Sequence, residues 1–191
     1  EEALLRVSIP YRIYGGLRFY ERLEIKNAIA YLKVVFNNND NPSFERSISN
    51  PTRGVGEKTL AKIRNTAKQF NLSYIKASAK LVDEGTIGGR GGAGLRDYLE
   101  FIAGCKSFIE ENLLSELMEL IIKETGLYAY HAKEPGEKGK TRTENLEELI
   151  TATKNFEQSV SEEKTNLEIA ENYLDIISLD SGDRQASEHD D

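Results

Sequence analysis

The chain has 191 residues, of which 39% are hydrophobic and 30% charged, and its formal net charge is −7 at pH 7. This length suits one domain with a core, or one domain and a tail, and the composition is typical of a soluble, helix-rich protein. No apolar run reaches the ~18 residues of a membrane span, and the acidic start does not resemble a signal peptide. Cys105 is the only cysteine, which excludes an intramolecular disulfide and a cysteine-based zinc site and favours a cytoplasmic location.

The charge is unevenly distributed along the chain. Residues 144–191 contain 14 acidic and 3 basic residues, a net charge of −11, so residues 1–143 carry +4. Between Phe44 and Lys68, six basic residues stand against two acidic ones, again a net +4. Because a phosphate backbone responds to local charge, the negative total does not exclude a nucleic-acid ligand. An ordinary basic helix face is the alternative interpretation.

The N-terminal segment predicts mixed structure. Residues 1–6 resemble the last turns of a helix, and residues 7–13 alternate between apolar and polar, which is the period of a strand. No second comparable strand follows, and a lone strand leaves its backbone groups unpaired. We therefore expect residues 1–19 to belong to a sheet whose other strands lie outside this chain.

The rest of the chain predicts helices. Apolar residues at helical spacing, together with capping residues, place helices at 21–36, 43–49, 57–70, 74–84, 95–110, 113–124, about 143–160 and 166–179. The expected N-caps of three of them are Ser73, Thr143 and Asn166. Residues 85–94 are glycine-rich, residues 131–140 form a predicted charged loop, and residues 179–191 are expected to be an acidic, disordered tail or linker.

Two glycine motifs resemble nucleotide-binding loops. Gly139-Lys140-Thr141 lacks the earlier glycine of a phosphate-binding loop, because Glu134 occupies that position, and no strand precedes it. Residues 89–94 match the dinucleotide-binding glycine pattern, again without a preceding strand. We therefore expect no nucleotide site at either motif.

Other candidates for chemistry are sparse. The two histidines, His131 and His189, lie in polar segments and are expected to be solvated. Cys105 is expected to be packed inside a helix. The acidic pairs Glu147-Glu148 and Glu162-Glu163 are typical of solvent-exposed helix faces. The sequence thus predicts no catalytic residue and no metal site.

The segment before the 57–70 helix is the most informative motif. Residues 51–60 read Pro-Thr-Arg-Gly-Val-Gly-Glu-Lys-Thr-Leu, an apolar residue between two glycines just before an amphipathic helix. This is the layout of a helix-hairpin-helix DNA-binding motif. Glycine allows the backbone to approach another molecule closely, and Val55 is expected to insert into the core. The amides of Gly54, Gly56 and the first helical turn would then be unpaired donors at the positive end of a helix.

Such a site binds phosphate without reading the base sequence. Arg53, Lys58 and Thr59 are expected to add side-chain contacts. An ordinary glycine-rich turn before a capped helix is the alternative interpretation of the same residues.

Three segments resemble signatures of the superfamily 1 DNA helicases of the UvrD/Rep/PcrA type. They are residues 14–26, 50–56 and 136–149, which occur in the family's order and spacing, and the resemblance covers about residues 1–178. It implies that residues 20–178 are the 2B subdomain, a mainly α, multi-helix accessory subdomain with a helix-hairpin-helix-like motif. It also implies that residues 1–19, with their single strand, are a remnant of the second RecA-like motor domain.

The resemblance implies a parent enzyme that uses ATP and Mg²⁺ to unwind DNA with 3′-to-5′ polarity in DNA repair. The family's ATP site, metal-binding acids and arginine fingers lie outside this chain, which by itself should bind no cofactor and be inactive. The family's duplex-binding role carries over to Thr52, Arg53, Gly54, Val55, Gly56, Lys58 and Thr59. Arg90, in the second glycine-rich stretch, is a candidate for a second contact, whereas residues 142–149 are expected to pack and to act as a hinge.

The expected partners are therefore duplex DNA, or a junction between single-stranded and duplex DNA, and the motor domains of the same chain. The rival hypothesis is a protein-interaction module that contacts the helicase motor or a repair partner, with DNA contact incidental. A nuclease or glycosylase hairpin domain is a third alternative, against which the lack of any acid, base or metal cluster argues.

Overall fold

The computed structural model describes residues 18–160 and 163–187, with side chains described as far as residue 179. Within these residues the structure is helical and contains no strand, so the prediction of a mainly α fold is confirmed. The helix end and the strand predicted between residues 1 and 13 lie outside the described residues.

A short 3₁₀ turn, η1 (Phe19–Glu21), leads into a series of α-helices. Their bounds are α2 Leu23–Phe36, α3 Asn41–Ser49, α4 Glu57–Phe70, α5 Tyr74–Asp83, α6 Gly89–Glu111, α7 Leu114–Glu124, α8 Leu127–Ala132, α9 Glu137–Ser159 and α10 Asn166–Ser187.

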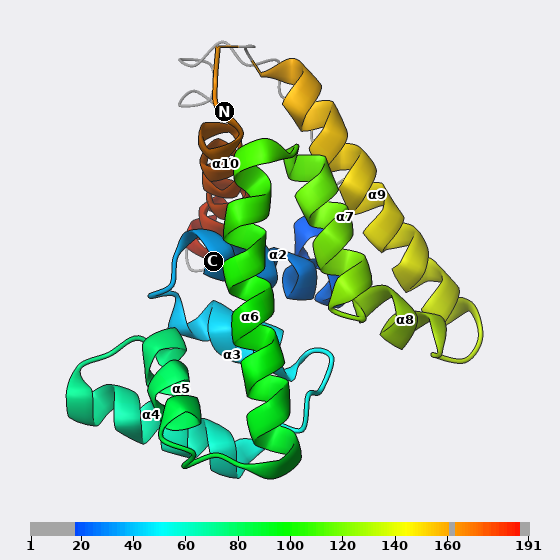
Figure 1. Cartoon of the computed structure of the whole chain (residues 1–191). Coiled ribbons are helices and arrows are strands. Elements are labelled where there is room, and N and C mark those ends of the chain that lie inside the picture. The colour runs from blue at the N-terminus through cyan, green and yellow to red at the C-terminus, as the bar shows by residue number, and fades with distance from the viewer. Residues whose placement is uncertain (1–17, 161–162, 188–191) are drawn as a thin grey trace.

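Helix α6 connects the two ends of the molecule. One end of α6 packs on the α4–α5 pair, and its other end lies beside α7 and α10 (Figure 1). Helix α2 crosses the middle and packs against α3, α6, α7 and α9. This arrangement places α4, α5 and the start of α6 at one end, which carries the glycine-rich motifs.

Helix α2 is the centre of the hydrophobic core. It is apolar on almost all sides, and Ile25, Tyr31 and Leu32 are completely buried, which is typical of a helix surrounded by other helices. Tyr31 lies with Phe44 of α3 and Tyr98 of α6 in an aromatic cluster, in which the Phe44 and Tyr98 ring centroids are 5.5 Å apart. This cluster supports the segment that leaves α3 toward α4.

Hydrogen bonds tie that segment to the cluster. The Tyr31 hydroxyl donates to the Asn50 carbonyl oxygen at 2.9 Å, and the hydroxyls of Tyr98 and Ser47 are 2.6 Å apart. Burial raises the pKa of both tyrosines well above the usual range, so both hydroxyls keep their protons and remain donors.

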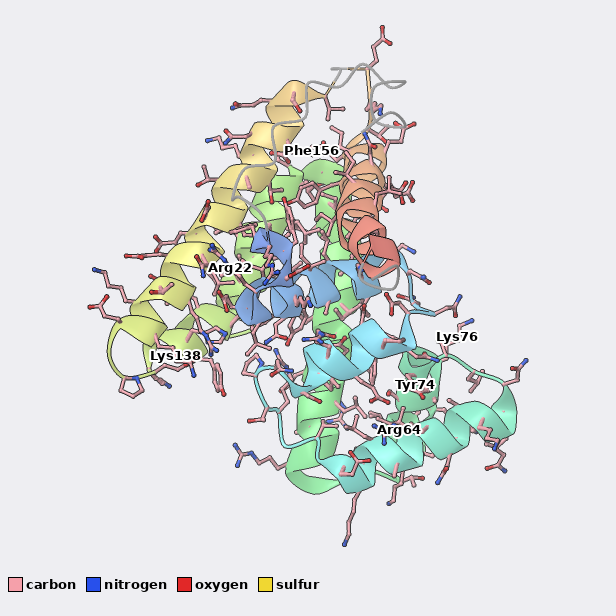
Figure 2. The ribbon with its side chains drawn as sticks, turned by 180° about the vertical axis from the view of Figure 1, so that it is seen from behind. Arg22, Arg64, Tyr74, Lys76, Lys138 and Phe156 are labelled. Carbon is pink, nitrogen blue, oxygen red and sulfur yellow. The ribbon has the colours of Figure 1, made fainter. Side chains whose placement is uncertain are left out.

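A buried polar network joins the start of α2 to α9. Glu24 is only 4% exposed, and its carboxylate accepts a hydrogen bond from the Asn145 side-chain amide at 2.6 Å. Arg142 Nε lies 3.6 Å from the same carboxylate. Arg22 donates to the side-chain oxygen of Asn145 and lies between the start of α2 and α9 (Figure 2). Two of the resemblance segments, 14–26 and 136–149, therefore meet here.

The expectation that His131 is solvated is wrong. This side chain is 1% exposed, and its Nδ1 lies 2.5 Å from a carboxylate oxygen of Glu134. The same oxygen accepts a hydrogen bond from Arg142 at 2.5 Å. These contacts extend the network from α9 to α8 and give the buried ring a partner at Nδ1, whereas Nε2 is buried without a hydrogen-bond partner among the described residues.

Capping was only partly predicted. Ser73 caps α5 as expected, since its hydroxyl accepts from the Lys76 amide at 3.4 Å. Thr143 does not begin a helix: α9 starts earlier, at Glu137, and the Thr143 hydroxyl donates to the Lys140 carbonyl within it. Thr165, rather than Asn166, caps α10, because Thr165 and Glu168 exchange backbone-to-side-chain hydrogen bonds.

Three other predicted boundaries were wrong. Helix α8 lies partly in the predicted loop 131–140, α6 begins within the glycine-rich stretch at Gly89 rather than at residue 95, and α10 extends to Ser187 instead of ending at residue 179. The early start of α9 has a packing cause. A Cβ atom at Gly139 would lie 2.4 Å from the Glu134 carbonyl oxygen, so glycine allows the first turn of α9 to contact the preceding segment. For α10, extending an existing helix needs no new nucleation.

Candidate nucleic-acid interface

The turn between α3 and α4 exposes its glycines and buries the residue between them. Val55 is 7% exposed and belongs to the core, as expected, whereas Gly54 and Gly56 are exposed. Gly54 has a φ of +75°, a backbone conformation that residues with a side chain rarely adopt. The buried Val55 therefore anchors a turn in which the glycine on each side of it is exposed.

This turn carries unpaired backbone donors. The N–H groups of Gly54, Gly56, Glu57 and Lys58 donate to no acceptor among residues 18–160 and 163–187. The next two amides along the chain, those of Thr59 and Leu60, donate to the Gly56 carbonyl at 2.9 and 3.0 Å. The free donors stand at the start of α4, where the helix dipole adds partial positive charge. These amides can therefore donate hydrogen bonds to an anionic oxygen.

A second helix start repeats this pattern beside the first. Ile87 is 7% exposed and precedes Gly88, the extended N-cap of α6, just as Val55 precedes Gly56, the extended N-cap of α4. A Cβ atom at Gly91 would lie 3.0 Å from the Gly54 carbonyl oxygen and 3.7 Å from the Thr59 hydroxyl. The first turns of α4 and α6 are therefore in contact.

The glycines of α6 have a packing role that sequence reasoning missed. A Cβ atom at Gly94 would lie 2.0 Å from the Arg53 carbonyl oxygen, a distance that no real side chain tolerates. Gly91 and Gly94 are three residues apart and therefore lie on one face of the helix. Together they allow α6 to pack directly against the backbone of the turn. Their spacing was the available signal, hidden within the longer glycine run.

Two basic side chains lie near these donors and form no ion pair within the described residues. Lys58 and Arg90 are exposed and make no ion pair or side-chain hydrogen bond with the part of the chain that the structure describes. The Arg90 stem covers Gly54, because its Cγ would lie 2.9 Å from a Cβ atom there. Thr52 is exposed and Thr59 half-buried. Both predicted hydroxyls thus lie close to the turn.

Arg53 is placed differently from the other predicted site residues. It is half-buried, and its guanidinium donates to the carbonyl oxygens of Pro51 at 2.8 Å and Thr125 at 3.0 Å. Its planar group also lies over the Tyr31 ring, 5.5 Å from the centroid. The side chain is therefore directed toward the interior, and its predicted contact with DNA stays a prediction.

The acidic residue at the start of α4 is held by an arginine. The Glu57 carboxylate accepts a hydrogen bond from Arg64 at 2.6 Å, and Arg64 also donates two bonds to Glu45 at 2.6 and 2.7 Å. Figure 2 shows Arg64 on α4, on the side of α3. These bonds from Arg64 lower the pKa of Glu45. The cluster counters the negative charge of Glu57 next to the free amides.

The end of the molecule that carries the turn is basic. Residues 41–97 contain ten lysines and arginines against five acidic residues, a net charge of +5, whereas residues 98–160 contain seven against twelve, a net −5. An open groove of about 440 Å³ runs beside the turn, and its lining residues are Pro51, Thr52, Arg53, Arg90, Ala93, Gly94, Asp97, Glu124 and Thr125. The candidate interface therefore combines free backbone donors with a local positive charge.

Residues 18–160 and 163–179, whose side chains the structure describes, hold no cluster of three or more histidine, cysteine, aspartate or glutamate side chains that could bind a metal ion. In the same ranges, no helix has the length and apolar character of a membrane span. Gly139, Lys140 and Thr141 lie inside α9, so the first glycine motif is not a loop.

Comparisons with known proteins agree with the resemblance noted above. Residues 1–84 match the family model of the UvrD-like helicase C-terminal domain. The chain is 42% identical to DNA helicase II of Escherichia coli over 97% of its own length and 26% of that protein. It is 43% identical to DNA helicase II of Haemophilus influenzae over 99% of the chain and 26% of the relative. It is 34% identical to the ATP-dependent DNA helicase PcrA of Bacillus subtilis over 98% of the chain and 25% of that protein. The chain thus spans about a quarter of the length of these relatives.

Proposed function

We propose that the chain, which is similar to DNA helicase II and to the ATP-dependent DNA helicase PcrA, is a regulatory subdomain of a UvrD/PcrA-type superfamily 1 helicase and binds duplex DNA. In this proposal residues 20–178 are the 2B subdomain of a 3′-to-5′ helicase that works in DNA repair. Residues 1–19 belong to its motor domain, and residues 179–191 form a tail or linker.

The exposed turn with its four free amides is the observation that carries the proposal. Backbone donors at a helix start bind phosphate oxygens whatever the base, because only the sugar–phosphate backbone is contacted. We propose that residues 52–59 act as a helix-hairpin-helix, in which Val55 anchors the hairpin while Gly54, Gly56 and Lys58 meet the phosphates. Thr52 and Thr59 would add hydroxyl contacts.

The start of α6 supplies a second set of donors. Its first turn touches the hairpin, and Arg90 is exposed beside Gly54. We propose that Arg90 meets a second phosphate. The charge difference between residues 41–97 and residues 98–160 would orient the basic end toward DNA at low salt.

In this proposal the chemistry of the parent enzyme lies elsewhere. ATP and Mg²⁺ would be bound by the motor domains of the same chain, and the subdomain would contact both those domains and the duplex at its junction with single-stranded DNA. The 191-residue chain alone would then show no ATP hydrolysis.

A salt titration of duplex binding tests this function. The wild-type chain and a Gly56→Ala variant would be titrated with a labelled duplex at increasing salt, with Gly104→Ala as the matched control. A methyl group at either position meets no atom within 4 Å, so both variants should fold. We expect weak binding that falls with salt. Gly56→Ala should bind about tenfold more weakly, because its methyl group would keep a phosphate oxygen from approaching the amides closely enough for charged hydrogen bonds. Gly104→Ala should bind like the wild type.

Two results would count against duplex binding. They are a wild-type chain that fails to bind at low salt, and a Gly56→Ala variant that binds as well as the wild type. Either result would favour the rival hypothesis, a protein-interaction module that contacts the motor domains or a repair partner.

A further inference from the structure

The Arg53 guanidinium donates hydrogen bonds to two carbonyl oxygens of the protein itself. Nη1 donates to the Pro51 carbonyl oxygen at 2.8 Å and Nη2 to the Thr125 carbonyl oxygen at 3.0 Å. The guanidinium carbon lies 5.5 Å from the Tyr31 ring centroid and 6.0 Å from that of Tyr98. These partners belong to α2, to α6, to the turn itself and to the corner between α7 and α8. These contacts hold the guanidinium toward the interior, with two of its five N–H donors bonded to carbonyl oxygens.

The distant partner of Arg53 is the end of a helix. Thr125 is the C-cap of α7, and the last carbonyl oxygens of a helix have no partner within the helix and carry partial negative charge. A guanidinium that donates to such an oxygen therefore stabilises the helix end and is itself held there. Arg53 thus links the glycine turn to the end of α7.

The corner that receives Arg53 is firmly held. The Thr125 hydroxyl donates to the Ile121 carbonyl oxygen at 2.6 Å and accepts from the Leu127 amide at 3.4 Å. A Cβ atom at Gly126 would lie 3.7 Å from the Pro51 ring. The turn therefore rests on the α7–α8 corner through both Pro51 and Arg53.

We infer that Arg53 is a positioning residue, which clamps the 51–56 turn to the C-terminal end of α7 and so holds the free amides in place for phosphate. This inference rests on the proposed function. A lysine could not replace Arg53, because an ammonium group lacks the planar fork that reaches two carbonyl oxygens while lying over an aromatic ring.

The test compares four versions of the full chain: wild type, Arg53→Ala, Arg53→Lys and Lys58→Ala. Duplex affinity is measured against salt at a temperature where all four are fully folded. Amide exchange of Thr59 and Leu60, which bond to the Gly56 carbonyl oxygen, is measured without DNA. The slope of log affinity against log salt counts phosphate contacts, at about 0.9 per phosphate for duplex DNA.

A clamp predicts one pattern. Both Arg53 variants should exchange these amides faster than wild type and bind about tenfold more weakly at every salt concentration, since the turn must then be ordered on binding. The slope should remain that of the wild type, and lysine should not rescue. Lys58→Ala should instead lower the slope by about 0.9 with unchanged exchange.

A direct phosphate contact by Arg53 predicts the opposite pattern, which would overturn the inference. Arg53→Ala would then lower the salt slope by about 0.9, and Arg53→Lys would restore the duplex affinity. The amides of Thr59 and Leu60 would exchange at the wild-type rate in both variants. Unchanged affinity in both Arg53 variants would overturn it as well, because Arg53 would then only stabilise the fold. If the wild type binds no duplex, the proposed function fails, and amide exchange alone tests the clamp. Faster exchange of the Thr59 and Leu60 amides in the Arg53 variants would support the clamp, and unchanged exchange would refute it.

Discussion

The side-chain amide of Asn145 donates a hydrogen bond of 2.6 Å to the Glu24 carboxylate, and this bond joins the first turn of α2 to the middle of α9. Both groups are buried, at 7% and 4% exposure. A buried carboxylate is unfavourable unless its oxygens are paired, and Asn145 and Arg142 supply the partners of Glu24. The segment 142–149, expected to pack rather than to touch DNA, thus fixes how the chain enters α2.

Loss of the amide should destabilise the protein. In Asn145→Ala the Glu24 carboxylate keeps its burial and loses a hydrogen bond, so the free energy of unfolding should fall by about 2 kcal/mol. The measurement is chemical denaturation at neutral pH. Asn155→Ala, in the same helix, is the matched control, because the Asn155 side chain makes no hydrogen bond with the described residues. Equal stability of the two variants would contradict the role of the network.

Acid should loosen the contact between α8 and α9. The hydrogen bond with His131, with a further contribution from Arg142, lowers the pKa of Glu134 from 4.5 to about 2, and Lys138 Nζ lies 3.5 Å from the same carboxylate. A carboxyl group whose pKa is lower in the folded state stabilises the protein above its unfolded pKa. That contribution should be lost as the pH falls from about 4.5 to about 2.

Unfolding midpoints measured across this pH range, for the wild type and Glu134→Gln, check this prediction. The variant should be less stable at neutral pH and should lose less stability on acidification than the wild type. Parallel pH profiles of the two proteins would show that Glu134 does not contribute.

The glycine at position 94 should not tolerate a side chain. In Gly94→Ala the new methyl group would lie 2.0 Å from the Arg53 carbonyl oxygen, so α6 or the turn must move, at a cost of about 2–3 kcal/mol of stability. Gly104→Ala, in the same helix and in open space, should instead gain about 0.5–1 kcal/mol from its better helix propensity. Thermal unfolding of both variants measures the difference, and equal melting temperatures would refute the close packing.

Removal of the acidic charge at the start of α4 should strengthen DNA binding. Glu57 lies beside the free amides and is only partly neutralised by Arg64, since it is exposed. Under the proposed function, Glu57→Gln removes a repulsion from phosphate and should raise duplex affinity about twofold to threefold at low salt, and less at high salt. Fluorescence anisotropy with a labelled duplex measures this change. Glu84→Gln, near the end of α5, serves as the control, and equal gains in the two variants would point to a general effect of net charge.

Much of the helical pattern could be predicted from the sequence because its causes are local. The bounds of α4 follow from apolar residues at helical spacing between Gly56 and Asn71, and they agree with the structure. Ser73 caps α5 through a hydroxyl three residues from its partner amide. The burial of Val55 follows from the position of one apolar residue between two glycines. In each case the deciding neighbours lie within a few residues along the chain.

What the sequence alone determined, then, was the helical class, most of the helices and the position of the exposed turn, because spacing and capping act over one or two helical turns. The tertiary structure decided the rest. The interior position of His131, the close packing at Gly94 and the inward direction of Arg53 depend on partners that the fold brings near them, such as the Thr125 carbonyl 72 residues away from Arg53. A residue's type and local spacing do not specify such a partner, because burial and hydrogen bonding depend on which surfaces meet once the helices have packed.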